Sequence, residues 1–150
     1  MPLRNHIFNI TKTLSCSPGF VYGTANELNQ LADDKSFPCV FMYPLQSIDM
    51  HPAVNGSVSN TFTVYLEFLH KTDFGQYTTD NETYVAQALQ LANEFLVKAS
   101  KYVDGQTRYF KIITTNKAKC LPVYNKYDVN TTGVGLTLTL QSQSFTNFNS

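Results

Sequence analysis

The stretch from residue 61 to residue 105 constrains the fold most, because a strand pattern runs directly into a long helix pattern. Apolar and polar side chains alternate over residues 61–68, as they do in a strand with one buried face. That face is predicted to consist of Phe62, Val64, Leu66 and Phe68.

The helix pattern that follows has a clear start and a clear end. Thr79 and Glu82 have the spacing of a capping box, which satisfies the free backbone N–H groups of a first helical turn. Asp104 and Gly105 are predicted to end the helix, since glycine adopts the left-handed conformation at low cost. Steps of three and four residues separate the predicted core positions Val85, Ala88, Leu89, Ala92, Phe95, Leu96, Ala99 and Val103.

Shorter elements precede this unit. Residues 2–14 have helical apolar spacing, and residues 20–23 favour a short strand. Thr24 and Glu27 repeat the capping-box spacing and predict a short helix. The apolar run 37–44, bracketed by prolines, suits a buried strand, whereas residues 45–60 are predicted to be irregular. Within that irregular stretch, Asn55-Gly56 is a hairpin signal that would join strands 38–43 and 61–69.

Strand patterns dominate the rest of the chain. Residues 108–114 favour a strand, and Pro122 restricts the segment 120–124 to an edge or a bulge. Residues 134–141 alternate most regularly. The order of elements predicts one α+β domain over residues 1–150, with a mainly antiparallel sheet covered on one face by the N-terminal helix and the long central helix. Residues 142–150 are predicted to form an extended tail.

The composition favours an assembly subunit over a nucleic-acid or membrane partner. Eleven basic and eleven acidic residues cancel, so no strong field is available to attract an anionic surface. Only 15% of residues are charged, and nine tyrosines contribute to the polar character. Protein interfaces are enriched in Tyr and Phe and depleted in Lys and Glu. A coding bias of the genome would produce the same composition, and both readings stay open.

No motif for catalysis, cofactor binding or metal binding emerges. His6, His51 and His70 lack metal-ligand spacing and are predicted to be ordinary surface or loop histidines. Cys16, Cys39 and Cys120 are too few and too dispersed for a disulfide scaffold. Cys16 and Cys39 are predicted to be buried thiols. We therefore expect a protein that is not an enzyme, with no catalytic residue, no cofactor and no metal ion.

The pattern of elements nevertheless resembles a known class of phage proteins. An amphipathic N-terminal helix precedes an apolar strand ending in Tyr43-Pro44, and the strand Phe-x-Val-x-Leu-x-Phe leads through an acidic turn into the long helix. Over residues 20–100 this resembles small neck or tail-completion (tail-terminator-like) proteins of tailed phages and prophages of Bacteroidetes-type hosts. Residues 45–60 and the C-terminal third depart from that pattern.

The resemblance implies a ring subunit of the virion neck or tail, assembled in the host cytoplasm. Its partners would be copies of itself, in a hexamer or dodecamer, and the neighbouring neck, connector and tail-tube proteins. DNA would only pass through the lumen, and no membrane is implied. The candidate contact segments are the loops 45–60 and 70–79 and the tail 142–150. Candidate contact residues in these segments are Asp49, His51, Asn55, Asp73, Phe74, Tyr77, Phe145 and Phe148.

An alternative reading is a small α+β ligand-binding domain or enzyme. Its pocket would lie between the central helix and the sheet and would use Tyr65, Glu67 and His70 at one strand end. Such a fold needs a concave site with converging polar groups. A concave site with these polar groups would therefore favour the ligand-binding reading, and its absence would favour the structural reading.

Overall fold

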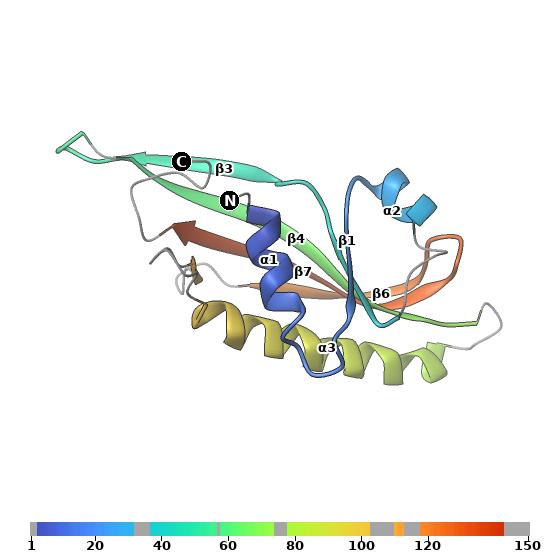
Figure 1. The fold of residues 1–150 in the computed structure, drawn as a ribbon. Helices are drawn as coiled ribbons and strands as arrows, with labels where there is room; N and C mark the ends of the chain where they lie inside the picture. The colour runs from blue at the N-terminus through green and yellow to red at the C-terminus, as the bar shows by residue number, and fades with distance from the viewer. Residues whose placement is uncertain are drawn as a thin grey trace.

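The computed structural model describes residues 3–31, 37–56, 58–73, 78–102, 110–112 and 118–142. Within them, three helices accompany one seven-stranded, mostly antiparallel sheet, so the predicted α+β class is confirmed (Figure 1). The elements in chain order are α1 (Leu3–Thr11), β1 (Gly19–Tyr22), α2 (Ala25–Leu31), β2 (Cys39–Met42), β3 (Ser47–Pro52), β4 (Val58–Lys71), α3 (Thr78–Ser100), β5 (Phe110–Ile112), β6 (Lys119–Lys126) and β7 (Thr131–Ser142).

The sheet is built around the antiparallel pair β4 and β7. Their register runs from Thr61 opposite Gln141 to Lys71 opposite Thr131. The other edge of β4 is shared by β3 at one end and β2 at the other end, and β1 adds to β2 in parallel. The other edge of β7 is shared in the same way by β5 and β6. The register of β6 shifts between Val123 and Lys126, so the predicted edge or bulge near Pro122 is confirmed.

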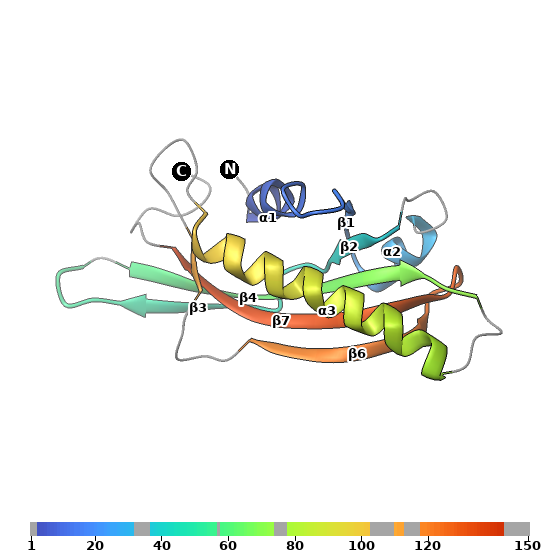
Figure 2. The same ribbon diagram turned by 90° about the horizontal axis from the view of Figure 1, so that it is seen from below.

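Helices α1 and α3 cover one face of the sheet, as predicted (Figure 2). Beneath them lies the main apolar core, where Phe68 and Phe95 pack edge to face with ring centroids 5.9 Å apart. Each fully buried large side chain contributes roughly 2 kcal/mol through removal from water. The core contains the predicted strand residues Phe62, Val64, Leu66 and Phe68 and, from the helices, Ile7, Ile10, Ala88, Ala92, Phe95 and Ala99.

The opposite face of the sheet carries a second, smaller core. Helix α2 lies on that face, on the far side of the sheet from α3 (Figure 1). Its predicted capping box is confirmed, because the Thr24 N–H donates to Glu27 Oε2 (3.3 Å) and the Glu27 N–H donates to Thr24 Oγ1 (3.5 Å). The residues buried in this core are Val21, Leu28, Cys39, Phe41 and Leu69.

The prediction of an irregular segment over residues 45–60 was wrong. Ser47–Pro52 forms β3, and Asn55-Gly56 lies in the turn that joins β3 to β4. Gly56 has a φ of 87°, a conformation that L side chains rarely adopt. The hairpin signal was therefore real but joins other strands than predicted. Strand β2 still pairs with β4 in the antiparallel sense.

Helix α3 also departs from its predicted boundaries and buried face. It begins at Thr78 and ends at Ser100, before the predicted stop at 104–105, which lies outside the described residues together with Val103. Leu89 was predicted to be buried but is 42% exposed, whereas Leu91 is buried. Successive helical residues rotate by about 100°, so the face that carries positions 88, 92, 95 and 99 lies nearer to position 91 than to position 89.

Candidate functional site

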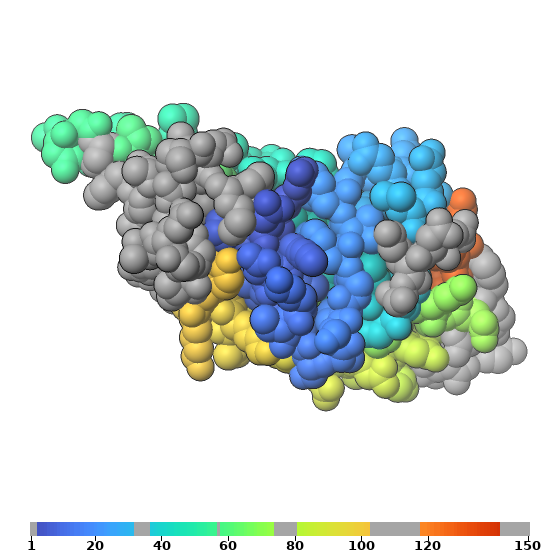
Figure 3. Space-filling model, in the orientation of Figure 1, coloured from blue at the N-terminus to red at the C-terminus, as the bar shows by residue number. Residues whose placement is uncertain are grey.

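A two-stranded arm projects from the sheet and is the most exposed part of the described fold. The arm consists of residues 47–56 and 58–60, and its tip protrudes beyond the body of the molecule (Figures 1 and 3). Every residue of β3 is exposed. Among the described residues, β7 pairs with β4 only from Thr61 onward, so Val58, Ser59 and Asn60 pair with β3 alone. An isolated two-stranded ribbon is marginally stable in water, which favours a partner.

The arm has one apolar and one polar face. Residues directly opposite each other in an antiparallel pair point to the same side of the sheet. Ile48 stands opposite Phe62 and Met50 opposite Asn60, so both continue the face that α1 and α3 cover elsewhere. Their side chains are 52% and 67% exposed. Asp49 stands opposite Thr61 on the other face. The arm is thus an amphipathic ribbon whose apolar side chains Ile48 and Met50 are exposed.

The structure separates the predicted contact residues into two groups. Asp49 and His51 lie on β3, and Asn55 lies at the tip of the arm. Asp73 follows the other end of β4, and a 14-residue strand spans roughly 45 Å. Asp73 therefore does not share a surface with Asp49, His51 and Asn55. Phe74, Tyr77, Phe145 and Phe148 lie outside the described residues.

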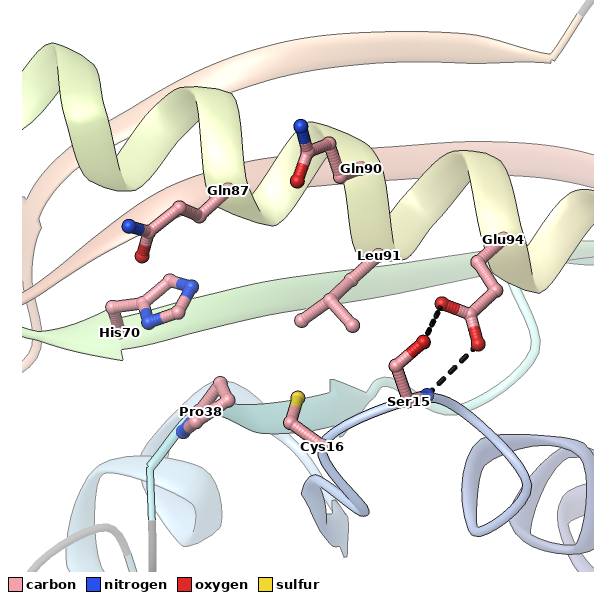
Figure 4. A pocket seen from close by; sticks show the side chains of 8 residues that line it. All are labelled: Ser15, Cys16, Pro38, His70, Gln87, Gln90, Leu91 and Glu94. Carbon is pink, nitrogen blue, oxygen red and sulfur yellow. Dashed lines mark hydrogen bonds between the residues drawn. The ribbon is translucent and has the colours of Figure 1, made fainter.

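A cavity lies beside α3, at the end of β4 that is far from the arm (Figure 4). Its volume is about 320 Å³. Helix α3 forms one wall, His70 of β4 and Pro38 form another, and the turn after α1 closes a third side. The lining residues are Ser15, Cys16, Pro38, His70, Gln87, Gln90, Leu91 and Glu94.

The two ends of this cavity differ in their electrostatics. At one end, His70 Nε2 is buried without a hydrogen-bond partner among the described residues, and burial lowers the pKa of the imidazole. At the other end, Glu94 accepts hydrogen bonds from the Ser15 N–H (2.8 Å) and Ser15 Oγ (2.7 Å). These bonds and the nearby Lys98 lower the pKa of Glu94. The cavity therefore holds a neutral imidazole and a carboxylate.

Glu67, by contrast, sits in a dense polar cluster on the other face of the sheet. Its side chain is fully buried. Oε1 accepts from the hydroxyl of Tyr127 (2.6 Å), and Oε2 accepts from Lys126 Nζ (2.6 Å) and the hydroxyl of Tyr65 (3.1 Å). Tyr43 completes the cluster, because its hydroxyl accepts from Lys126 Nζ (3.1 Å) and hydrogen-bonds to the hydroxyl of Tyr127.

This cluster holds its protons tightly. Burial raises the pKa of Tyr65 and Tyr127, and the carboxylate of Glu67 raises both further. Burial opposes the charge of Lys126, but the hydrogen bond and the attraction of Glu67 outweigh it, so the pKa of Lys126 also rises. Because its carboxylate accepts hydrogen bonds from three side chains, we assign Glu67 a structural role. The ligand-binding reading placed Tyr65, Glu67 and His70 in one pocket. The structure instead places Tyr65 and Glu67 in this cluster and His70 at the cavity.

Two of the predictions for single histidines and cysteines were wrong. His6 was predicted at the surface but is buried against Tyr102, with Nδ1 3.0 Å from the hydroxyl of that residue. Cys16 was predicted to be buried but is exposed, whereas Cys39 is buried as expected. His51 is on the arm, 3.1 Å from Thr61 Oγ1. The apolar spacing of residues 3–14 contained the signal for His6, because positions 3, 6, 7 and 10 share one helical face.

Among the described residues, no three His, Cys, Asp or Glu side chains lie close enough together to hold a metal ion. The described helices also include none that is long and apolar enough to cross a membrane.

Comparison with known proteins adds no assignment to these geometric observations. No protein-family model matches the chain, and no curated protein matches it either.

Proposed function

We propose that this chain is a structural subunit of a phage neck or tail-terminator ring, which caps the tail tube and joins it to the connector. The observation that supports this proposal most is the arm, an amphipathic ribbon whose apolar side chains Ile48 and Met50 face solvent in the single chain. A second copy of the same chain is the proposed occupant. The resemblance over residues 20–100 supplies the biological setting.

The symmetry of a ring fits a projecting arm. Head-to-tail association uses two different surfaces of each subunit and closes into a ring when the rotation permits. The arm supplies one surface, because it extends away from the body and presents an open strand edge at β3. Each arm would cover its apolar face on the next protomer. The apolar face of the sheet, which α1 and α3 cover within one subunit, would then be covered by the neighbouring subunit along the arm.

The proposed setting defines the partners and the chemistry. The subunit would assemble with itself as a hexamer or dodecamer and would contact the neck, connector and tail-tube proteins of the virion. DNA would traverse the lumen without a specific site. The subunit would perform no catalysis, and its work would be mechanical: a rigid body that positions neighbours.

Mass photometry over a concentration series, followed by negative-stain imaging, tests the proposal. The full-length chain is expected to form a discrete six- or twelvefold species with a central hole, alone or on purified tail tubes. The double variant Ile48→Thr/Met50→Thr keeps β propensity but removes apolar contact, and it is expected to remain a folded monomer.

Leu121→Thr is the matched control for the arm variant. Like Ile48 and Met50, Leu121 is an exposed apolar residue of a strand, with 56% of its surface exposed. It lies on β6 opposite Gly135, away from the arm. The control is expected to assemble like the unaltered chain. A chain that stays monomeric at all concentrations and ignores tail tubes would contradict the proposal, as would an arm variant that assembles normally.

A further inference from the structure

The cavity beside α3 has the size of a small-molecule site and has no part in the proposed ring contacts of the arm. Its volume of about 320 Å³ is at the lower end of the range of about 300 to 1,000 Å³ for ligand pockets. It lies at the end of β4 where His70 is found, whereas the arm is at the other end. The inference below therefore stands independently of ring assembly.

The charges of the lining select against anions. Among the eight lining residues, none is Lys or Arg, and the only full charge is the carboxylate of Glu94, which pairs with Lys98 outside the lining (3.4 Å). Burial and Glu94 both raise the pKa of the Cys16 thiol, so this group also stays neutral at physiological pH. An anionic ligand would lose its hydration in the cavity and would find no positively charged lining residue in return. This transfer is unfavourable in free energy.

The remaining lining groups accept hydrogen bonds or pack against apolar stems. His70 Nε2 accepts when the proton of the neutral ring resides on Nδ1. The side chain of Gln87 extends from α3 toward His70, and Gln90 offers a second amide oxygen. Leu91 and Pro38 provide apolar surface between these groups and Glu94 (Figure 4). The cavity therefore combines hydrogen-bond acceptors, an apolar surface and one carboxylate. Such a lining complements a cation that is carried on a short hydrocarbon stem.

We propose that this cavity binds a small organic cation, a guanidinium or primary ammonium group on a short alkyl stem. The cationic head donates to His70 Nε2 and to the amide oxygen of Gln87, the stem lies against Leu91, and Glu94 supplies the favourable field. The ligand explains why His70 Nε2 is buried without a hydrogen-bond partner among the described residues, because such an atom is costly.

Calorimetric titration of the full chain with n-butylguanidinium tests the proposal directly. Two probes of similar size replace the cationic head group with a neutral or an anionic one: pentanamide and pentanoate. The cation is expected to bind at one site per chain, pentanamide at least tenfold more weakly, and pentanoate without measurable heat. Equal binding of pentanoate and n-butylguanidinium, or no saturable binding of the cation, would overturn the proposal.

A pair of variants assigns the binding to this cavity. Gln87→Lys places a competing ammonium group at the lining of the cavity and is expected to abolish binding of the cation. Asn93→Lys adds the same charge to an exposed position of α3 that does not line the cavity, and it is expected to bind within twofold of the unaltered chain. Loss of binding in both variants, or in neither, would contradict the assignment.

The imidazole of His70 supplies a site-specific reporter. Tyr84 of α3 packs against this ring with centroids 5.7 Å apart, and Cys16 and Glu94 are the other titratable groups of the lining. A bound cation repels a proton from His70, so its pKa, followed by NMR, is expected to fall further on saturation. A His70 pKa that stays unchanged while butylguanidinium binds would place the binding elsewhere and overturn the proposal.

The source of the cation is resolved by one more probe. Nα-acetyl-arginine methylamide carries the same guanidinium on a peptide backbone. Binding of n-butylguanidinium alone assigns the site to a free small molecule. Comparable binding of the blocked arginine assigns it to an arginine side chain of another protein chain.

Discussion

The two faces of β4 solve the same burial problem in different ways. On one face, Phe62, Val64, Leu66 and Phe68 belong to the apolar core under α1 and α3. On the other face, the alternate residues include Glu67, which is equally inaccessible to water but needs three hydrogen-bond donors. Apolar burial is non-directional and tolerates sliding, whereas a buried carboxylate fixes the position of every donor around it.

This difference indicates that the apolar face contributes most of the stability, whereas the polar face around Glu67 fixes a unique arrangement of the segments that meet there. Lys126 ends β6 and Tyr127 begins the turn that leads to β7, and their contacts with Glu67 fix this turn against β4. Gly135 stands opposite Glu67, and a Cβ there would collide with the hydroxyl of Tyr65. The polar face thus depends on a close fit among separate segments, and four substitutions or conditions probe the contrast.

The largest effect is expected on the apolar face. Phe95→Asp places a carboxylate in a fully buried site next to Phe68 and should destabilise the protein by more than about 4 kcal/mol. Circular dichroism and urea unfolding measure the loss. Leu89→Asp is the matched control on the same helix, and its exposed position predicts a cost of about 1 kcal/mol or less. Equal costs for the two would contradict the assignment of the buried face of α3.

A smaller effect is expected on the polar face. Lys126→Met removes the only cation bound to Glu67 in the described cluster but leaves two tyrosine donors, so about 2 kcal/mol should be lost. The double variant Glu67→Gln/Lys126→Met removes both charges and should recover part of that loss. Urea unfolding of all four members of the cycle measures the coupling. Additive effects would show that the pair does not stabilise the fold.

Alkaline pH should weaken the polar face selectively. The pKa values of Tyr65, Tyr127 and Lys126 are raised in the folded protein, so the folded state holds protons that the unfolded state releases. Their contribution is complete below the unfolded pKa values of about 10 and is lost as the pH rises above them. Unfolding midpoints from about pH 8 to 11 should fall, and they should fall less steeply in Glu67→Gln. Identical slopes would contradict this account.

The smallest effect is expected at the tip of the arm, which belongs to neither buried face. Gly56→Ala forces an L side chain into a positive φ, and nothing lies near the added Cβ. A cost of about 1 kcal/mol or less is expected, confined to the hairpin. Hydrogen exchange of the β3 amides should quicken while β7 stays protected. Global destabilisation would show that the arm is coupled to the core.

Much of the fold could be predicted from local patterns. The alternation in β4 and β7 identified which residues enter the core, because the side-chain period of a strand is fixed. The capping box of Thr24 and Glu27 formed as its spacing indicates. Even β3 had a signal that was overlooked, since Ile48 and Met50 alternate with Ser47, Asp49 and His51. A strand with no buried face gives only this weak alternation, and Pro44 and Pro52 obscured it.

The candidate sites were less predictable. The contact residues chosen from loops proved to include two positions on a strand, Asp49 and His51. The cavity combines the turn after α1, the start of β2, the end of β4 and the middle of α3, and no sequence spacing links these segments. Among the residues proposed for a pocket, only His70 lines it.

The sequence by itself determined the α+β class, the antiparallel strands and the apolar face beneath the two helices, because hydrophobic periodicity acts over a few neighbouring residues. The tertiary structure alone decided that Leu91 and not Leu89 is buried, that Glu67 contacts Lys126 and Tyr127, and that His70 lines a cavity. These contacts join residues tens of positions apart, and the packing of several elements at once selects them.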